Sequence, residues 1–482
     1  MKAIKNLKRK LINYLFKVYF YNMKVVLILL LLAIGTKAQV SLDLNSAISE
    51  ALENNHNVKI AQYTLETAEK DVSEAYGFAY PRLDFNAQYN RAVIKPKIIF
   101  AGGGFGNMFP EPLINAIATA AGVDPSTLSG GNSEDYQAIT AGSNNNFRTT
   151  LELTQPIFNY SVFTGIGSSA IYKKVAEESL NSEQSNTVKN TKIAYFATLL
   201  SKESVEVVKS SFENAQKRLD EITIMYNEGL ISEYEQLRAS VQVENLKTEL
   251  ANSETNYINA KNNLKLVIGM ESSEDILLKD NFNTHLKNTT VPEFEETYSK
   301  LLAANPQLKS LEYQVEVQDA FIDLNRAEYM PRLDLFANYV MQGQSDDFNF
   351  FTADQSDIGL RFSMNLFSGF QTNTKVAKAQ INKEMAITQK MLVTQSLKNN
   401  AENVLLRMKT AKLQIESSQS TVKQAQRAYA ISKIRFNEGV GSQIEMNDAD
   451  LALRQATINY LNASYNYLSA RSEYENLIGN IQ

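Results

Sequence analysis

The feature that most constrains this chain is an internal duplication with a long period. Residues 44–89 align with 294–339 at a constant offset of 250, and both segments carry Pro-Arg-Leu-Asp, at 81–84 and 331–334. Residues 226–269 align with 436–479 at an offset of 210, with Asn-Glu-Gly in both. The unit is much longer than the roughly 20 to 50 residues of solenoid repeats. We therefore expect one architecture built twice.

Composition excludes several classes of function. The 482 residues carry a net charge of -5 and no cysteine, so we expect no nucleic-acid partner, no disulfide and no lipid anchor on a cysteine. The two histidines, His56 and His285, have no companions at metal-ligand spacing. No set of nucleophile, base and orienting group can be assembled from the local sequence. We expect no metal, no cofactor and no enzymatic activity.

The N-terminus resembles an export signal. Lys24 precedes an apolar core at 25–34 and small residues up to Ala38, a core too short to span a bilayer but typical of a signal peptide. We assign residues 1–38 to the signal region, with the mature chain starting near Gln39. Residues 1–22 are either a long basic leading segment or an over-called start upstream of Met23. Beyond Ala38 no apolar run reaches about 18 residues, which excludes a transmembrane helix.

Each repeat begins with a helix followed by two amphipathic strands. The first helix is predicted over 44–78 and ends before Pro81, because proline disfavours helix in the residue before it. Apolar and polar residues then alternate with a period of two, which predicts strand pairs at 81–158 and 331–367. The second strand of the first pair is expected to stop at Pro156. We read the inserts at 95–146 and 343–356 as surface loops, the first with a helix at 113–121. Tyr89 and Tyr339 are expected at a membrane interface.

Long helices follow the strands. Residues 167–226 and 372–436 lack proline and interior glycine, and some 60 residues at 1.5 Å each form a rod of roughly 90 Å. Gly229 and Gly439 supply the positive φ of a helix C-terminus. Glu235 and Glu445 follow Ser232 and Ser442 by three residues, which predicts capping boxes at the starts of returning helices. We therefore expect helical hairpins at 165–269 and 370–479.

Heptads in the returning helices indicate coiled-coil packing. The seven-residue series are Val243, Leu250, Tyr257 and Leu264; Leu246, Ser253, Ala260 and Val267; Leu453, Tyr460, Tyr467 and Tyr474; and Ala456, Ala463, Ala470 and Leu477. Apolar residues beside the last seam, namely Leu461, Tyr465 and Leu468, predict contact with two neighbouring helices. The first structural repeat is assigned to 39–290, with a linker at 270–290, and the second to 291–482.

The expected fold is mainly α with a small β part. Four strands cannot close a transmembrane barrel, which needs about 8, and an open sheet edge in lipid leaves backbone groups unpaired at several kcal/mol each. The chain must therefore oligomerise, and a trimer supplies twelve strands.

The duplicated order of helix, Pro-Arg-Leu-Asp strand, second strand, long hairpin and terminal Leu-Ile-Gly resembles the outer membrane efflux protein (TolC) family, over about residues 40–479. The resemblance implies a homotrimer with a trimeric α-barrel and a 12-stranded transmembrane β-barrel, embedded in outer membrane lipid and extending into the periplasm. It implies a passive exit duct for efflux or type I secretion, docked to a periplasmic adaptor (membrane fusion) protein and an inner-membrane pump or ABC transporter. The alternative is a periplasmic coiled-coil adaptor or scaffold without a membrane barrel.

The family closes its duct at the periplasmic hairpin tips, and this implies sites on the present chain. The matching acids are Glu235, Glu445 and Asp448. Phe436 stands where the family has a tyrosine, so the hydroxyl of a hydrogen bond that locks the gate is absent here. Gly441 stands where a well-studied member has a basic residue, so this chain lacks that contact too. The adaptor-facing tips correspond to Glu228, Gly229 and Leu230 in the first hairpin, and to Glu438, Gly439 and Val440 in the second.

Structural roles compete with these assignments. A capping box explains Glu235 and Glu445 without any gate, a helix C-cap explains both glycines, and Asp448 is either a gate residue or a solvated acid. The transported substrate cannot be read from these residues.

Overall fold

The computed structural model describes residues 40–95, 97–100, 109–128, 137–140, 142–271, 275–287 and 289–480. The expected signal region at 1–38 lies outside these residues. The chain divides into two compact units, each drawing on both repeats. The helical unit comprises the described residues up to 68, 172–316 and those from 384 onward, and the strand unit comprises 69–171 and 317–383.

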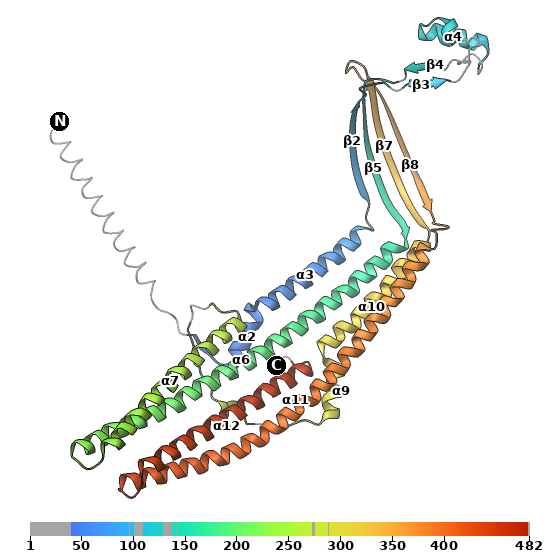
Figure 1. Cartoon of the computed structure of the whole chain (residues 1–482). Helices are drawn as coiled ribbons and strands as arrows, with labels where there is room; N and C mark the ends of the chain where they lie inside the picture. Colours follow the sequence, from blue (N-terminus) through green and yellow to red (C-terminus); the bar gives the residue numbers. More distant parts are fainter. Residues whose placement is uncertain are drawn as a thin grey trace, which may run out of the picture. The chain divides into compact units, whose positions relative to one another are not determined.

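One antiparallel sheet dominates the strand unit (Figure 1). Its strands are β2 (Arg82–Arg91), β5 (Asn145–Asn159), β7 (Arg332–Ser345) and β8 (Phe351–Ser363), in the order β2-β5-β7-β8. The four predicted strands are therefore confirmed. Alternation places Phe85 and Phe362 on an apolar face, where they are 69% and 67% exposed. The outer strands β2 and β8 are the two edges of the sheet.

Two strand boundaries differ from the prediction. β5 continues past Pro156, where the sequence predicted a stop, because the register shifts between Pro156 and Phe158 and this irregularity accommodates the missing amide donor. β7 and β8 pair through most of the segment 343–356 that was expected to be a loop, so that only 346–350 connect them. Residue alternation underestimated these strands because their outer ends, at 343–345 and 351–356, do not keep a regular alternation of apolar and polar residues.

The insert at 95–146 contains more structure than a surface loop. The predicted helix at 113–121 is confirmed as α4 (Glu111–Ala121), and the insert also holds β3 (Lys97–Phe100), α5 (Pro125–Leu128) and β4 (Gln137–Thr140). β3 and β4 form an antiparallel pair. Asp346, in the β7–β8 turn, holds both limbs of the insert, because its carboxylate accepts from Lys95 Nζ at 2.8 Å and from the Asn144 amide at 2.8 Å.

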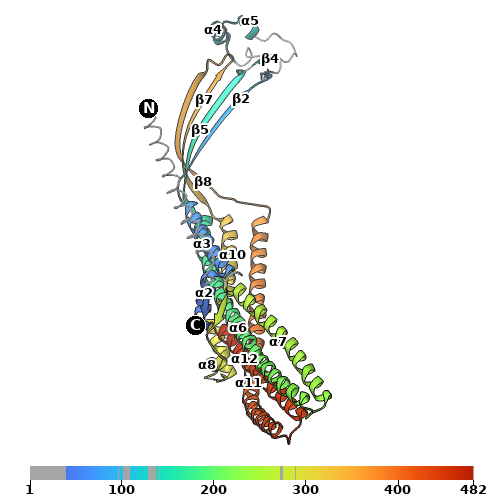
Figure 2. The ribbon, with the colours of Figure 1, turned by 90° about the vertical axis from the view of Figure 1, so that its left-hand side faces the viewer.

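Helices of both repeats follow the same order. Their bounds are α2 (Leu44–Asn54), α3 (His56–Gly77), α6 (Tyr160–Asn227), α7 (Glu233–Ile268), α9 (Phe294–Ala304), α10 (Pro306–Arg326, followed by a 3-10 turn at Ala327–Tyr329), α11 (Gln371–Asn437) and α12 (Gln443–Leu477). Both long hairpins are confirmed, and their ends lie side by side in Figures 1 and 2.

The single helix predicted at 44–78 is wrong, because an asparagine interrupts it. Asn55 is extended, with ψ 130°, and its Oδ1 accepts from the Asn57 amide at 2.8 Å, which starts α3. Its Nδ2 donates to the carbonyl of Val267 at 2.7 Å. The second repeat has the same junction, in which Asn305 Nδ2 donates to the Leu477 carbonyl at 3.0 Å. Each junction thus binds the C-terminus of the returning helix.

One of the four predicted heptad seams is fully buried, and the other three are partly buried. In α12 all four residues of the alanine seam are buried, as are Tyr467 and the flanking Leu461 and Leu468, which confirms contact with two neighbours. All of these residues except Ala456 join Tyr195 and Leu199 of α6 in the main hydrophobic core of the helical unit. In α7 the ends of the seams, Val243, Leu246 and Leu264, are the buried members.

The segment 270–290, expected to be a linker, is structured in its described part. β6 (Ile276–Leu278) pairs in parallel with β1 (Val40–Leu42), and α8 (Phe282–His285) follows. Asp280 accepts from Tyr195 Oη at 2.8 Å, and burial together with this carboxylate raises the pKa of Tyr195. Within the described ranges, no helix has the length and apolar content needed to cross a membrane.

Candidate functional site at the hairpin tips

The turns at the two hairpin tips have the same backbone geometry. Gly229 and Gly439 both have φ +74°, and their amides donate to the carbonyls of Tyr226 at 2.9 Å and Phe436 at 3.0 Å. The residue after each glycine donates to the carbonyl five residues earlier, which completes the bonding pattern of a glycine C-cap. All six predicted tip residues are exposed, including Leu230 and Val440 at 66% and 67%.

Each predicted capping box forms one of its two hydrogen bonds. Ser232 accepts from the Glu235 amide at 3.4 Å and Ser442 accepts from the Glu445 amide at 3.2 Å. Among the described hydrogen bonds, neither glutamate side chain returns to the amide of its serine. Both carboxylates face other groups, so capping does not account for their side chains.

Glu235 contacts the second hairpin. With the carboxamide nitrogen of Gln443 facing the acid, Gln443 Nε2 donates to Glu235 Oε2 at 2.6 Å and to the Glu235 carbonyl at 3.3 Å. Gln443 is 6% exposed although it lies in the first turn of α12. This amide–carboxylate pair therefore joins the tips of the two hairpins within one chain.

A basic group stands beside Glu445. Arg435 Nε lies 3.8 Å from Glu445 Oε2, and Arg435 Nη2 donates to the Val440 carbonyl at 3.2 Å. A Cβ on Gly441 would lie 2.9 Å from the Cβ of Arg435, so this position favours glycine while Arg435 crosses the turn. The sequence reasoning missed Arg435, although it directly precedes Phe436, which is half-buried. Asp448 is exposed and makes no hydrogen bond or ion pair with the part of the chain that the structure describes.

A buried group of charged side chains lies further inside the hairpins, and we call it the inter-hairpin cluster. Its members are Ser211 and Arg218 of α6, Glu249 of α7, Tyr429 of α11, and Asp450 and Arg454 of α12. Arg218 Nη1 donates to Tyr429 Oη at 3.4 Å, and Arg454 forms an ion pair with Glu249. The Ser211 hydroxyl favours the ionised form of Asp450 and so opposes the rise of its pKa. The cluster connects all four long helices.

Burial dominates the electrostatics of the inter-hairpin cluster. Asp450, Arg454 and Arg218 are 4%, 7% and 8% exposed. Burial raises the pKa of Asp450, while Arg218 and Arg454 oppose that rise. Arg218 Nη2 and Arg454 Nε are buried without a hydrogen-bond partner among the described residues. Asp450 therefore adds a negative charge near Arg218 and near Arg454, which also pairs with Glu249, whereas the sequence reasoning selected Asp448.

Other predicted positions are resolved as follows. Tyr89 lies near the end of β2 and donates to Asn145 Oδ1 at 2.8 Å, whereas Tyr339 lies in the middle of β7. Both side chains project from the apolar face and are about half exposed, and their place at a membrane interface stays a prediction. No group of three metal-ligating side chains occurs in the described ranges.

Comparison with known proteins identifies a family. The model of the family described as "Outer membrane efflux protein" matches residues 116–270 and 297–480, which covers both repeats. The chain is similar to outer membrane protein TolC of Escherichia coli, with 23% identity over 72% of each chain. It is also similar to the alkaline protease secretion protein AprF of Pseudomonas aeruginosa, with 19% identity over 67% of each chain.

A solved structure shares the fold. The outer membrane channel CmeC of Campylobacter jejuni superimposes with a TM-score of 0.70 and 20% identity, over 91% of this chain and 85% of that one. At this identity the likeness establishes the fold alone.

Proposed function

Because this chain belongs to the outer membrane efflux protein family, and is therefore an outer membrane exit duct for efflux or secretion, we propose that it works as a homotrimer docked to a periplasmic adaptor and an inner-membrane pump or ABC transporter. The family consists of efflux channels, not enzymes. The alternative of a periplasmic adaptor or scaffold is not favoured by this membership.

The open edges of the sheet are the observation that supports the proposed trimer most directly. β2 and β8 each have one unpaired edge, and the apolar face carries exposed Phe85, Leu360 and Phe362. In lipid, every unpaired backbone group costs several kcal/mol. Three copies would join β2 of one chain to β8 of the next and close twelve strands into one barrel, with the polar faces inside.

Helix surfaces support the same assembly. Met385, Leu392, Leu406 and Leu413 of α11 share one heptad position, and each is about 60% exposed. Such a stripe has coiled-coil spacing, yet none of the helices that the structure describes covers it. A neighbouring copy would bury it, which gives the helices the same threefold arrangement as the strands.

We place the periplasmic gate at the hairpin tips. The Glu235–Gln443 contact would hold the two hairpins of one chain together, and the Arg435–Glu445 pair would stiffen the second tip. Asp448 has a free carboxylate one turn further in, and Phe436 is the apolar residue beside the turn. Repeated by threefold symmetry at a constriction, such acids would repel anions and favour cations.

The adaptor would dock on the exposed tips. Leu230 and Val440 are the large apolar side chains there, and each follows a glutamate and a glycine. An apolar side chain presented by a rigid C-cap is suited to fill a pocket of a helical partner.

Outer-membrane fractionation of the full-length protein tests this proposal. We expect the chain in the outer-membrane fraction, extractable only with detergent and migrating as an oligomer that heat dissociates. Recovery of the chain in the soluble periplasmic fraction without detergent would contradict the proposed duct.

A further inference from the structure

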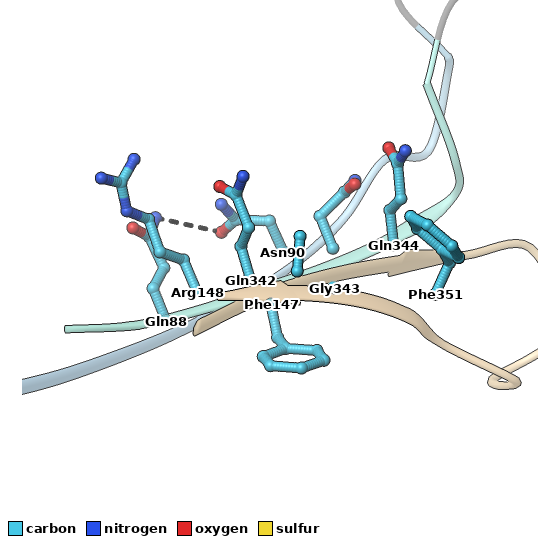
Figure 3. A pocket seen from close by; sticks show the side chains of 10 residues that line it. Gln88, Asn90, Phe147, Arg148, Gln342, Gly343, Gln344 and Phe351 are labelled. Atoms are coloured by element: carbon cyan, nitrogen blue, oxygen red, sulfur yellow. Dashed lines mark hydrogen bonds between the residues drawn. The ribbon is translucent and has the colours of Figure 1, made fainter. Parts of the chain in front are cut away.

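The strand register sorts the polar face of the sheet into rows. Gln88, Arg148 and Gln342 are direct partners across β2, β5 and β7, so the arginine stands between two carboxamides. The next row toward the β7–β8 turn consists of Asn90, Asn146 and Gln344. Figure 3 shows the labelled side chains of these rows on one face of the strands and the ring of Phe147 on the opposite face; the labelled members are Gln88, Asn90, Arg148, Gln342 and Gln344.

These rows line a hollow of about 470 Å³, which we call the arginine groove. Gln88 Nε2 donates to Asn90 Oδ1 at 3.3 Å, the bond drawn in Figure 3, and Phe351 also lines the groove. Arg148 is exposed and has no hydrogen bond or ion pair with any residue that the structure describes. All donors of its guanidinium group are thus available to a ligand.

The charge of Arg148 is also uncompensated within the sheet. The nearest acids on the same face of β2 and β5 are Asp84 and Glu152, each four residues along its strand from the Arg148 row and therefore roughly 13 Å away. Asp84 is already engaged by Arg82 at 2.7 Å. A guanidinium group flanked by carboxamides is a donor set that fits carboxylate or phosphate oxygens.

We propose that the arginine groove is a contact site for oxyanion-bearing cargo, carrying a carboxylate or phosphate group, as it crosses the end of the sheet nearest the β7–β8 turns. This inference rests on the proposed trimer, in which the polar face lines the duct and three Arg148 side chains form one ring. The ring would act on cargo independently of the acids at the hairpin tips.

The test uses full-length trimer in a planar lipid bilayer. Citrate and inorganic phosphate are added in turn on the side of the β7–β8 turns, and the half-blocking concentration of each is measured. We expect Arg148→Gln to raise the half-blocking concentration about tenfold, as loss of a charge-assisted hydrogen bond predicts. The matched control is Arg82→Gln, which removes the same charge from the same face but from an arginine that Asp84 already pairs; we expect it to resemble the wild type.

Three results overturn different parts of the account. Absence of any conductance in the wild type contradicts the proposed duct itself. A conducting wild type that neither anion blocks contradicts the arginine groove alone. Equal shifts in Arg148→Gln and Arg82→Gln also contradict the groove, because they show a general effect of charge in the lumen. If Arg148→Gln raises the half-blocking concentration of citrate but not that of phosphate, the groove binds carboxylates and not phosphates.

Discussion

At the scale of single residues, two aspartates show how burial changes a role. Asp448 and Asp450 are two positions apart on α12, about 200° around the helix, and so occupy opposite faces. Asp448 is exposed, whereas Asp450 lies between Arg218 and Arg454. Arg454 precedes the buried Leu461 and Leu468 by seven and fourteen residues, so heptad spacing alone places it on the same face of α12. Heptad spacing does not identify its partners on α6 and α7, because they depend on how the hairpins pack.

Asp450→Asn should stabilise the protein at neutral pH, because burial makes the folded state favour the neutral form of this side chain, and Arg454 keeps its ion pair with Glu249. Asp448→Asn is the matched control and should leave stability unchanged. Thermal melting followed by circular dichroism measures both variants. Equal melting temperatures for the two variants would mean that burying the charge of Asp450 costs the folded protein nothing.

The raised pKa of Asp450 predicts a pH dependence. In the unfolded chain the pKa of this aspartate is near 3.8, and in the folded protein it is higher. At pH values between these two pKa values the folded state therefore binds more protons than the unfolded chain. The contribution of this group to stability should therefore fall as pH rises from about 3.8 through the raised pKa. Melting temperatures of the wild type should show this loss as the pH rises above about 3.8, and Asp450→Asn should lack that component. If melting temperature changes with pH in the same way in the wild type and in Asp450→Asn, Asp450 does not cause the pH dependence.

Asp448→Ala tests the gate. If Asp448 lines the constriction, removing its charge lowers electrostatic control of the closed tip, and cation conductance in planar bilayers or antibiotic leakage in cells should rise. Glu228→Ala, at the exposed turn of the other hairpin, is the control. Unchanged single-channel behaviour would remove Asp448 from the gate.

At the scale of elements, the sequence predicted the long hairpins, the four paired strands and the heptad seams, because each has a strong apolar period. It did not predict the break at Asn55, since the asparagine ends α2 by bonding to Val267, more than 200 residues away. The pairing of β1 with β6 was missed for the same reason, because three-residue strands have no usable period. At the tips, the sequence predicted the roles of the glycines and of the capping serines. It did not predict the Glu235–Gln443 contact, because that contact depends on packing between the hairpins.

Four glycines with similar backbone angles provide a test of the helix junctions. Gly229 and Gly269 both have φ +74°, but a Cβ on Gly229 meets nothing within 4 Å, whereas a Cβ on Gly269 would lie 2.4 Å from the Asn54 carbonyl oxygen. Gly439 and Gly479 form the corresponding pair, and a Cβ on Gly479 would lie 2.4 Å from the Ala304 oxygen.

Gly229→Ala should cost about 1 kcal/mol, the penalty of the left-handed conformation. Gly269→Ala should cost roughly 2–4 kcal/mol, because the junction backbone must also move. Thermal melting of the two variants gives the comparison, and Gly479→Ala against Gly439→Ala repeats it in the second hairpin. Similar losses for both members of a pair would show that the junctions do not pack tightly.

At the scale of the whole molecule, the duplication explains why one chain supplies four strands and two hairpins, and why this number is insufficient. The open edges of β2 and β8, the apolar face of the sheet and the exposed stripe of α11 all require a neighbour. The proposed gate and the arginine groove acquire their rings only by symmetry. Every functional proposal above therefore depends on the number of copies.

Native mass spectrometry of the full-length protein, released from detergent micelles, measures that number most directly. The account predicts that three copies of the chain dominate the spectrum at low collision energy, and that a monomer appears only as the energy rises. A spectrum with stable monomer alone under gentle conditions would contradict the shared barrel.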